Sequence, residues 1–217
     1  MRQGFIFDAD GTLIDSMPIW KTVGQVYLRQ RGIEPPADVA MLFKTSTFTE
    51  TAAYFQRLGV HEKKEEIIQG IVALVHEAYA TEVPVKPGVA EALSQVSQRQ
   101  IPMCVLTASE QEYLTPCLEH NGILQYFSAI FTCTQLKKTK KEPSIFIETA
   151  QSLGCAPEET VVFEDSLHCI LAAKAAGCRV AAVQDEASKE DWEKICQVTD
   201  WTAPTVGALP WHQIFLS

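Results

Sequence analysis

The sequence contains no run of about 18 apolar residues, so no membrane-spanning helix is expected. The first apolar run ends at Asp8, too early for a secretory signal peptide. The seven cysteines are an odd number and include no C-x-x-C pair, which argues against a disulfide framework or a zinc site. These absences favour a cytoplasmic protein with reduced thiols and no contact with membranes.

Basic residues are scarce: 18 Lys and Arg face 27 Asp and Glu, which gives a formal net charge of -9. This balance argues against a nucleic-acid partner held by general electrostatics. It is compatible with a small anionic substrate, because such a site needs only local positive charge. With 217 residues, 47% of them hydrophobic, the chain can bury one large core, or one core and a smaller insert.

Short apolar runs alternate with helical patterns over most of the chain, which predicts an α/β fold with a Rossmann-like parallel sheet. The expected strands are residues 4–7, 103–106, 129–132, 161–163 and 180–183. The expected helices between them are residues 88–99, 110–121, 143–153 and 166–176.

The segment after the first expected strand breaks this alternation, because its patterns are helical throughout. The predicted helices are residues 20–31, 37–42, 49–58 and 63–80, separated by glycines and prolines. The sequence therefore predicts a helical insert at residues 16–83 within an α/β core made of residues 1–15 and 84–217.

Two aspartates, Asp8 and Asp10, directly follow the first expected strand, and Gly11 allows a tight turn there. Ligands of open parallel sheets bind beyond the carboxyl ends of the strands. Close carboxylates at such a place are costly unless a cation or substrate compensates them. The alternative is an ordinary turn with solvated aspartates.

Polar groups also follow two other expected strands. Thr107, Ala108 and Ser109 precede a helix, where a hydroxyl and free amides suit a phosphate, although Thr107 or Ser109 could equally be an ordinary N-cap. Glu164 and Asp165 precede the next helix and could merely cap it. Together with Asp8, these acids form an oxygen-ligand set for a hard cation such as Mg²⁺.

A lysine-rich loop contains the highest density of positive charge in the chain. Its members are Lys137, Lys138, Lys140 and Lys141. A solvated surface loop is the default interpretation. Carboxylates around a phosphate nevertheless need a balancing cation besides a metal, so one of these lysines is a candidate for the site.

The four motifs, in this order and spacing, resemble the haloacid dehalogenase superfamily over nearly the whole chain. They are Asp8-x-Asp10-Gly11-Thr12-Leu13-x-Asp15-Ser16, Leu106-Thr107-Ala108-Ser109, Lys140-x-x-Pro143-Ser144-Ile145-Phe146 and Phe163-Glu164-Asp165-Ser166. The place of the insert is similar to the branch with a small helical cap, which includes phosphoglycolate phosphatase and β-phosphoglucomutase.

The resemblance implies a Mg²⁺-dependent phosphatase of a small phosphorylated metabolite, acting through an aspartyl-phosphate. Asp8 would be the nucleophile, and Asp10 the general acid and then the base. Mg²⁺ would be bound by Asp8, the backbone carbonyl of Asp10 and Asp165, with Glu164 supporting the metal directly or through water. Phosphoryl oxygens would be held by Thr107, the Ala108 amide and Lys140, which is chosen because it lies three residues before Pro143.

The sequence departs from the family pattern at three places. Lys141 stands where proline is usual, Ser144 where aspartate is common and Cys169 where glycine is usual. None of these is a catalytic position, so the departures concern loop geometry. True dehalogenases lack the second aspartate of the first motif, so the presence of Asp10 favours phosphorus chemistry.

The cap residues differ from those of the mutases. Trp20 replaces a histidine and Phe48 stands near the place of an arginine, while Lys44 matches a basic position. Trp20 and Phe48, with Met17 and Phe43, either line an aromatic mouth or form the core of the cap, and for Phe43 the core is preferred. Three functions follow: a phosphatase first, then a sugar-phosphate mutase, and last an inactive binding domain. A monomer or a weak dimer is expected.

Overall fold

The computed structural model describes residues 3–42 and 46–216 and divides the chain into two compact units. The first, here the α/β unit, consists of Met1–Asp15 and Pro84–Ser217. The second, here the helical unit, is Ser16–Val83. Within the described ranges, no helix combines the length and the apolar character that crossing a membrane requires.

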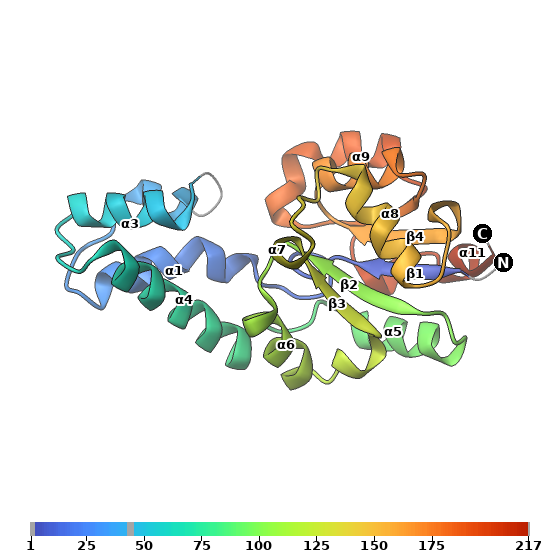
Figure 1. The fold of residues 1–217 in the computed structure, drawn as a ribbon, viewed down its shortest axis with the longest axis horizontal. Coiled ribbons are helices and arrows are strands. Elements are labelled where there is room, and N and C mark those ends of the chain that lie inside the picture. The colour runs from blue at the N-terminus through green and yellow to red at the C-terminus, as the bar shows by residue number, and fades with distance from the viewer. Residues whose placement is uncertain (1–2, 43–45, 217) are drawn as a thin grey trace. The chain divides into compact units, whose positions relative to one another are not determined.

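A six-stranded parallel sheet forms the centre of the α/β unit, with strand order β3-β2-β1-β4-β5-β6 (Figure 1). The strands are β1 Gly4–Phe7, β2 Met103–Thr107, β3 Ala129–Thr132, β4 Thr160–Glu164, β5 Arg179–Val183 and β6 Trp201–Ala203. The predicted Rossmann-like α/β class is confirmed. Strand β6 was not expected from the sequence; it is three residues long, pairs with β5 at the edge of the sheet and keeps Thr202 exposed.

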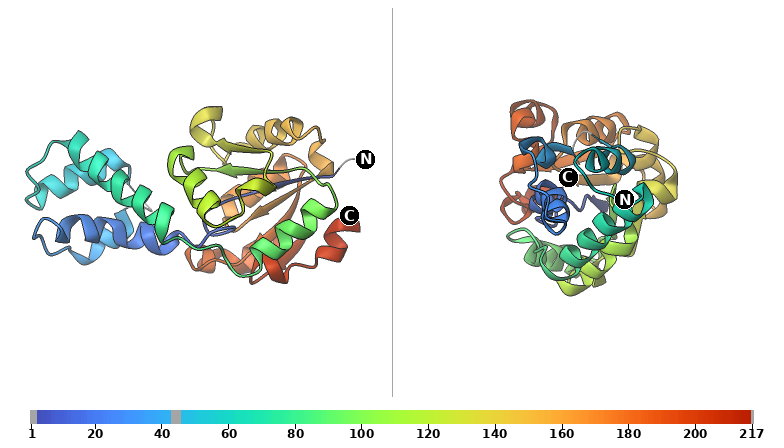
Figure 2. Two further views of the ribbon diagram at one scale, coloured as in Figure 1. Left: turned by 90° about the horizontal axis from the view of Figure 1, so that it is seen from below. Right: turned by 90° about the vertical axis from the view of Figure 1, so that its left-hand side faces the viewer.

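Helices connect the strands and cover both faces of the sheet (Figure 1). They are α5 Val89–Gln98, α6 Gln111–His120, α7 Cys133–Leu136, α8 Pro143–Ser152, α9 Leu167–Ala175, α10 Trp192–Val198 and α11 Trp211–Leu216. Short 3₁₀ turns are η2 Leu124–Tyr126, η3 Pro157–Glu159, η4 Glu186–Asp191 and η5 Val206–Ala208. In Figure 2, the C-terminal segment with α11 lies beside α5, in agreement with the packing of η5 on α5.

The core is buried on both faces of the sheet, as expected for parallel strands. On one face, Phe7 stacks on Phe163 with ring centroids 4.2 Å apart, and Trp211 of α11 stacks on Phe163 at 5.3 Å. On the other face, Ile6 and its neighbours pack against buried side chains of α8 and α9. Both faces of β1 are therefore fixed, which holds the residue that follows it.

Four helical segments make up the helical unit: α1 Met17–Arg29, η1 Ala37–Met41, α3 Phe48–Arg57 and α4 Lys64–Thr81. The predicted helix at 37–42 is a 3₁₀ turn, whose Val39 N–H bonds the Pro36 carbonyl three residues earlier at 3.2 Å. A capping box starts α3, because Thr47 and Glu50 bond each other's backbone N–H. Buried Tyr27 fits against Gly70, where a Cβ would lie 2.6 Å from its ring.

The segments at the two crossings between the units pair with each other inside the α/β unit. The Asp15 N–H donates to the Pro84 carbonyl at 2.9 Å, and the Lys86 N–H donates to the Leu13 carbonyl at 2.8 Å. An antiparallel bridge joins Ile14 and Val85 between them. The start of the second crossing is thus tied directly to the loop that follows β1.

Candidate active site

Asp8 follows β1 at the carboxyl end of this interior strand. Its side chain is buried, and its Oδ1 accepts a hydrogen bond from Lys140 Nζ at 2.6 Å. Its Oδ2 has no hydrogen-bond partner among the residues that the structure describes. A buried carboxylate oxygen without a partner is costly unless a cation or ligand binds it. Asp8 Oδ2 is therefore the oxygen of this carboxylate that is available to bind a cation or a ligand.

Lys140 is the lysine of the basic loop that the structure brings to Asp8. It is buried, and its Nζ also donates to Glu164 Oε1 at 2.5 Å. The other lysines of the loop lie at the surface: Lys137 and Lys141 are exposed, and Lys138 pairs with Glu148 at 2.5 Å. The interpretation of these lysines as solvated surface residues is thus correct for the rest of the loop but wrong for Lys140.

Glu164 ends β4 and has both carboxylate oxygens engaged within the protein. Oε1 accepts from Lys140, while Oε2 accepts the N–H groups of Asp165 at 2.7 Å and Ser166 at 2.8 Å. The amide bonds resemble the capping role that the sequence left open. The ion pair with Lys140 adds a second role, because it holds the ammonium against Asp8.

Asp165 lies beside Asp8 and Glu164, and one oxygen of each of the three buried side chains lies within 4.8 Å of the others. Its Oδ2 accepts a hydrogen bond from Ser188 Oγ of η4 at 2.9 Å. Residues from β1, β4 and the loop after β5 therefore meet at one point, as the topology of the sheet requires.

The buried charges perturb one another. Burial, assisted by Glu164 and Asp10 and opposed by Lys140, raises the pKa of Asp8 to about 7. Burial also raises the pKa of Asp165 well above its ordinary value, and the nearby charges of Glu164 and Asp8 add to this effect. Burial alone would lower the pKa of Lys140, but Asp8 and Glu164 outweigh it and hold that pKa well above normal. Such perturbed groups are typical of functional sites.

The side chain of Asp10 is directed to the end of β2. Its Oδ2 accepts a hydrogen bond from Ser109 Oγ at 2.5 Å and lies 3.5 Å from Thr107 Oγ1. The predicted acid thus stands next to the predicted phosphoryl-binding residues, although its carboxylate is not part of the cluster of Asp8, Glu164 and Asp165.

Thr107 ends β2 as a buried residue, while Ala108 is exposed beside it. Thr107 Oγ1 accepts the Ser109 N–H at 2.9 Å. The N-cap of α6 is Glu110, without a side-chain cap bond, so the alternative that Thr107 or Ser109 is the N-cap of this helix is wrong. The two hydroxyls face Asp10 instead.

The donor set fits a hard divalent cation. The three clustered carboxylates of Asp8, Glu164 and Asp165 face one buried ammonium, that of Lys140, which leaves an excess of negative charge when all three are ionised. All ligands that they offer are oxygens, and one of them, Asp8 Oδ2, lacks a partner in the part of the chain that is described. Oxygen ligands of this kind suit Mg²⁺.

Sequence reasoning did not assign several groups that the structure places around these residues. Ser188 and Asp185 lie in the loop after β5, where no motif signals them. Lys86 donates to Asp185 Oδ2 at 2.9 Å and to the Gly11 carbonyl at 2.5 Å. In the sequence, Lys86 lies directly before Pro87-Gly88, but nothing in that pattern predicts a role for its side chain.

The three departures from the family pattern leave the site intact. Lys141 and Ser144 are exposed, so their side chains make no demand on the core. Cys169 is buried in α9, where burial and the neighbouring Glu164 raise the pKa of its thiol. The thiol consequently stays protonated beside the Glu164 carboxylate.

The helical unit engages its own aromatic residues. Trp20 Nε1 donates to the hydroxyl of buried Tyr79 at 2.9 Å, and the Trp20 ring lies 6.5 Å from that of Phe48. These contacts fit the interpretation that the two residues pack within the cap. Phe43, predicted for the core of the cap, and Lys44, matched to a basic position of the cap loop, lie outside the described residues.

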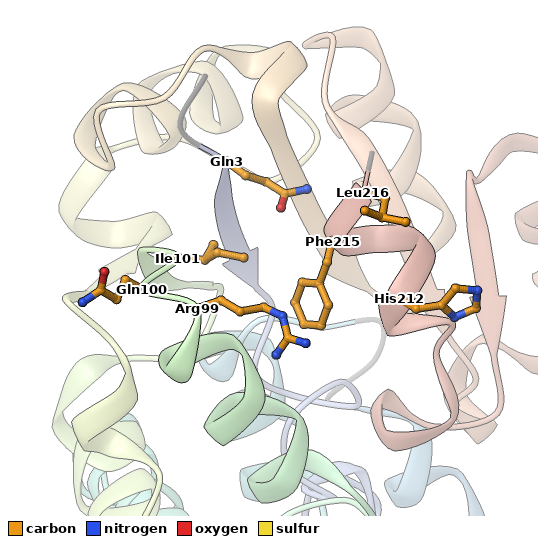
Figure 3. A pocket seen from close by; sticks show the side chains of 7 residues that line it. All are labelled: Gln3, Arg99, Gln100, Ile101, His212, Phe215 and Leu216. Atoms are coloured by element: carbon orange, nitrogen blue, oxygen red, sulfur yellow. The ribbon is translucent and has the colours of Figure 1, made fainter.

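A hollow of about 650 Å³ lies at the other end of the sheet, before the strands begin (Figure 3). It is lined by Gln3, Arg99, Gln100, Ile101, His212, Phe215 and Leu216. Its Arg99 guanidinium lies 4.0 Å from the centroid of the Phe215 ring. None of the predicted site residues lines it, so it is not the place of the proposed chemistry.

Comparison with known proteins gives consistent matches. Residues 5–183 match the model of the haloacid dehalogenase-like hydrolase family. Hexitol phosphatase A of Escherichia coli K12 is 31% identical over 183 residues, which cover 83% of this chain and 82% of that protein. Phosphoglycolate phosphatase 1 of Pseudomonas aeruginosa is 29% identical over 188 residues, covering 82% and 68%.

Solved structures share the same fold. A crystal structure of a candidate β-phosphoglucomutase from Thermotoga maritima aligns with a TM-score of 0.81 at 22% identity. The alignment covers 94% of this chain and 95% of that one. At this identity the match supports the architecture alone.

Proposed function

The chain belongs to the haloacid dehalogenase-like hydrolase family, and on this premise we propose that it is a Mg²⁺-dependent phosphatase of small phosphorylated metabolites. The observation that carries the proposal is the unpartnered, buried Asp8 Oδ2 beside the Lys140 ammonium and the Asp165 carboxylate. A carboxylate held in this way is a nucleophile with its own counter-charge.

Asp8, Asp165 and the backbone carbonyl of Asp10 would hold Mg²⁺, which supplies positive charge to the phosphoryl oxygens when it is bound. Glu164 supports this set by fixing Lys140, because both of its oxygens already have protein partners. Lys140 then neutralises charge on Asp8 and on the transferring group.

In the first step, a lone pair of the Asp8 carboxylate attacks phosphorus and the bond from phosphorus to the leaving oxygen breaks. Asp10 donates its proton to that oxygen, so the product leaves as an alcohol. The Thr107 hydroxyl and the Ala108 N–H hold the phosphoryl oxygens. The product on the enzyme is an aspartyl-phosphate at Asp8.

In the second step, Asp10 takes a proton from water, and the water oxygen attacks phosphorus. The bond between phosphorus and Asp8 breaks, which restores the carboxylate and releases inorganic phosphate. Ser109 Oγ, 2.5 Å from Asp10 Oδ2, holds this carboxylate in place through both steps.

The substrate class is proposed from the relatives, whose names specify hexitol phosphates and phosphoglycolate. A panel of phosphomonoesters that includes both should release inorganic phosphate with Mg²⁺ present. Turnover should disappear in excess EDTA and return with Mg²⁺. Asp8→Asn, which removes the nucleophile, is the matched inactive control. Full activity in excess EDTA, or in Asp8→Asn, would contradict the proposal.

The competing activity is that of a sugar-phosphate mutase. It would use the same aspartyl-phosphate intermediate but needs a cap that keeps water away. Trp20 and Phe48 stand where the mutases have polar residues, and each lost hydrogen bond to a charged group is worth about 1.5–3 kcal/mol. Hydrolysis should therefore dominate. A coupled assay for glucose 6-phosphate, started with β-glucose 1-phosphate and the glucose bisphosphate, separates the two activities. If glucose 6-phosphate forms faster than inorganic phosphate, the protein is a mutase.

A further inference from the structure

Lys86 is a second buried lysine beside the candidate site, and the proposed chemistry does not use it. Its side chain is only 10% exposed, and that of its partner Asp185 is 6% exposed. The Lys86 ammonium donates to three acceptors: the Gly11 carbonyl at 2.5 Å, the Gln184 carbonyl at 3.1 Å and Asp185 Oδ2 at 2.9 Å. A lysine ammonium has three donors, so this set is complete.

Gly11, the residue that Lys86 binds, directly follows Asp10 in a strained loop position. Its φ of +89° lies in the left-handed region that glycine tolerates. A Cβ at this residue would lie 3.0 Å from Asp165 Oδ2 and 3.3 Å from Asp185 Cγ. The backbone of the loop therefore passes directly against a carboxylate of the proposed metal site and against the partner of Lys86.

The two backbone bonds of Gly11 hold two neighbouring peptide groups of this loop. The Gly11 N–H donates to the Ile14 carbonyl at 3.0 Å, and the Gly11 carbonyl accepts from Lys86. The Asp10 carbonyl and the Gly11 N–H belong to one planar peptide group and point in opposite directions. The bond to Ile14 therefore holds the Asp10–Gly11 peptide directly, whereas Lys86 holds the next peptide group, Gly11–Thr12.

Both ends of Lys86 hold the same loop. Its backbone N–H donates to the Leu13 carbonyl at 2.8 Å, while its ammonium reaches Gly11 two residues earlier. Asp185 is in turn fixed by its Oδ1, which accepts the Ala187 N–H at 2.9 Å in the segment that carries Ser188. Ser188 donates to Asp165. One chain of contacts thus connects Lys86 to two of the proposed metal ligands.

We propose that Lys86 is a positioning residue for the proposed reaction: it fixes the Gly11–Thr12 peptide, and through it the turn that presents the neighbouring Asp10 carbonyl to the proposed metal site. The inference rests on the proposed function. Lys86 does not contact the phosphoryl group; it acts through Gly11 and Asp185. Groups that support metal ligands in this way commonly contribute about 10–100-fold to metal affinity or activity.

The rival explanation is that Lys86 only neutralises buried Asp185 and so stabilises the fold. Removing one partner of a buried ion pair leaves an uncompensated charge, and this alone lowers stability. The double variant K86M/D185N separates the explanations, because it removes the stranded carboxylate charge but does not restore the bond to the Gly11 carbonyl.

The test compares Lys86→Met and K86M/D185N with the wild-type protein and with Lys174→Met. Lys174 is a matched control in the same unit, since it pairs with Asp200 at 2.7 Å at the surface and, among the described residues, makes no ion pair with a site residue. Mg²⁺ affinity is measured by titration calorimetry without substrate, folding by thermal unfolding in EDTA, and kcat and KM by phosphate release.

Both Lys86 variants should bind Mg²⁺ about 10–100-fold more weakly and lose kcat with little change of KM at saturating metal. Lys174→Met should match the wild type. If Lys86→Met does not fold, the double variant decides. Wild-type Mg²⁺ affinity in a folded variant lacking Lys86 overturns the inference. A wild-type protein that binds no Mg²⁺ overturns the proposed function itself, which is a separate and recognisable result.

Discussion

Replacing Lys140 by Met should damage both the stability and the chemistry of the site. The Lys140 ammonium lies 2.6 Å from Asp8 Oδ1 and 2.5 Å from Glu164 Oε1, and all three side chains are at least nine-tenths buried. Met retains most of the volume of the side chain but removes its charge. The substitution therefore leaves two buried carboxylates without their counter-ion, next to Asp165.

The size of the effect follows from that burial. Breaking a buried ion pair by removing one partner costs about 3–5 kcal/mol. This is a large part of the total stability of a domain, which is about 5–15 kcal/mol. The loss should be smaller in Mg²⁺ than in EDTA, because a cation bound to Asp8 and Asp165 compensates part of the charge. Loss of a preorganised positive group in the site should also lower kcat by about 10²–10³-fold.

The pH profile gives an independent measurement. Lys140 lowers the pKa of Asp8, so without it that pKa should rise further above about 7. The acidic limb of the kcat/KM profile should then move to higher pH. Lys141→Met is the control: Lys141 is exposed, and its replacement should change the free energy of unfolding by less than about 0.5 kcal/mol.

Denaturant unfolding in EDTA and in Mg²⁺, together with steady-state kinetics of both variants, tests this reasoning. The result that refutes it is a Lys140→Met protein as stable as the Lys141→Met protein, with an activity loss below about tenfold. Such a result would mean that the Lys140 side chain is exposed to solvent rather than buried against Asp8 and Glu164. The charge balance inferred for the site would then be wrong.

Three further predictions concern the aspartates. Asp10→Asn keeps an acceptor for Ser109 Oγ but cannot transfer a proton, so hydrolysis of an alkyl phosphate should fall about 10²–10⁴-fold. A nitrophenyl phosphate, whose leaving group needs no proton, should lose less; equal losses in the two steady-state assays would argue against the acid role. Asp8 has a folded pKa of about 7, raised by burial above its unfolded value of about 4. The metal-free folded state therefore binds more protons than the unfolded state between these values, and its stability should fall as pH rises through that window. Mg²⁺ needs the ionised carboxylate, so its affinity should rise by up to about tenfold per unit between pH 6 and pH 7. Calorimetry at pH 6 and pH 8 tests this, and an affinity that is the same at both would show that Asp8 is ionised without metal.

Local sequence determined much of this protein. Buried parallel strands need apolar residues on both faces, so runs such as Gly4–Phe7 are visible without any structure. Polar residues that directly follow such runs must gather at one edge of the sheet. This is why Asp8, Thr107 and Asp165 could be named from the sequence, with the resemblance to the family supplying their roles. The edge strand β6 was missed because three residues, one of them exposed, carry too little periodicity.

Contacts between distant segments were decided only by the tertiary structure. Lys140 differs from Lys141 in burial, and that difference arises from how the loop after α7 approaches Asp8 and Glu164, 132 and 24 residues away in the chain. Glu164 could have been a metal ligand or a capping group; the structure engages both of its oxygens within the protein. The N-cap of α6 is likewise Glu110 rather than Thr107 or Ser109.

The groups that support the site left the weakest trace in the sequence. Ser188 reaches Asp165 from a 3₁₀ turn after β5, and Lys86 reaches Gly11 across 75 residues. A hydrogen bond of this kind depends on where two loops come together, and that place is set by the packing of the whole sheet rather than by local periodicity. The sequence alone therefore determined the elements and the residues at their ends, whereas the partners of those residues, and with them the pKa values and the charge balance of the site, were decided by the tertiary structure.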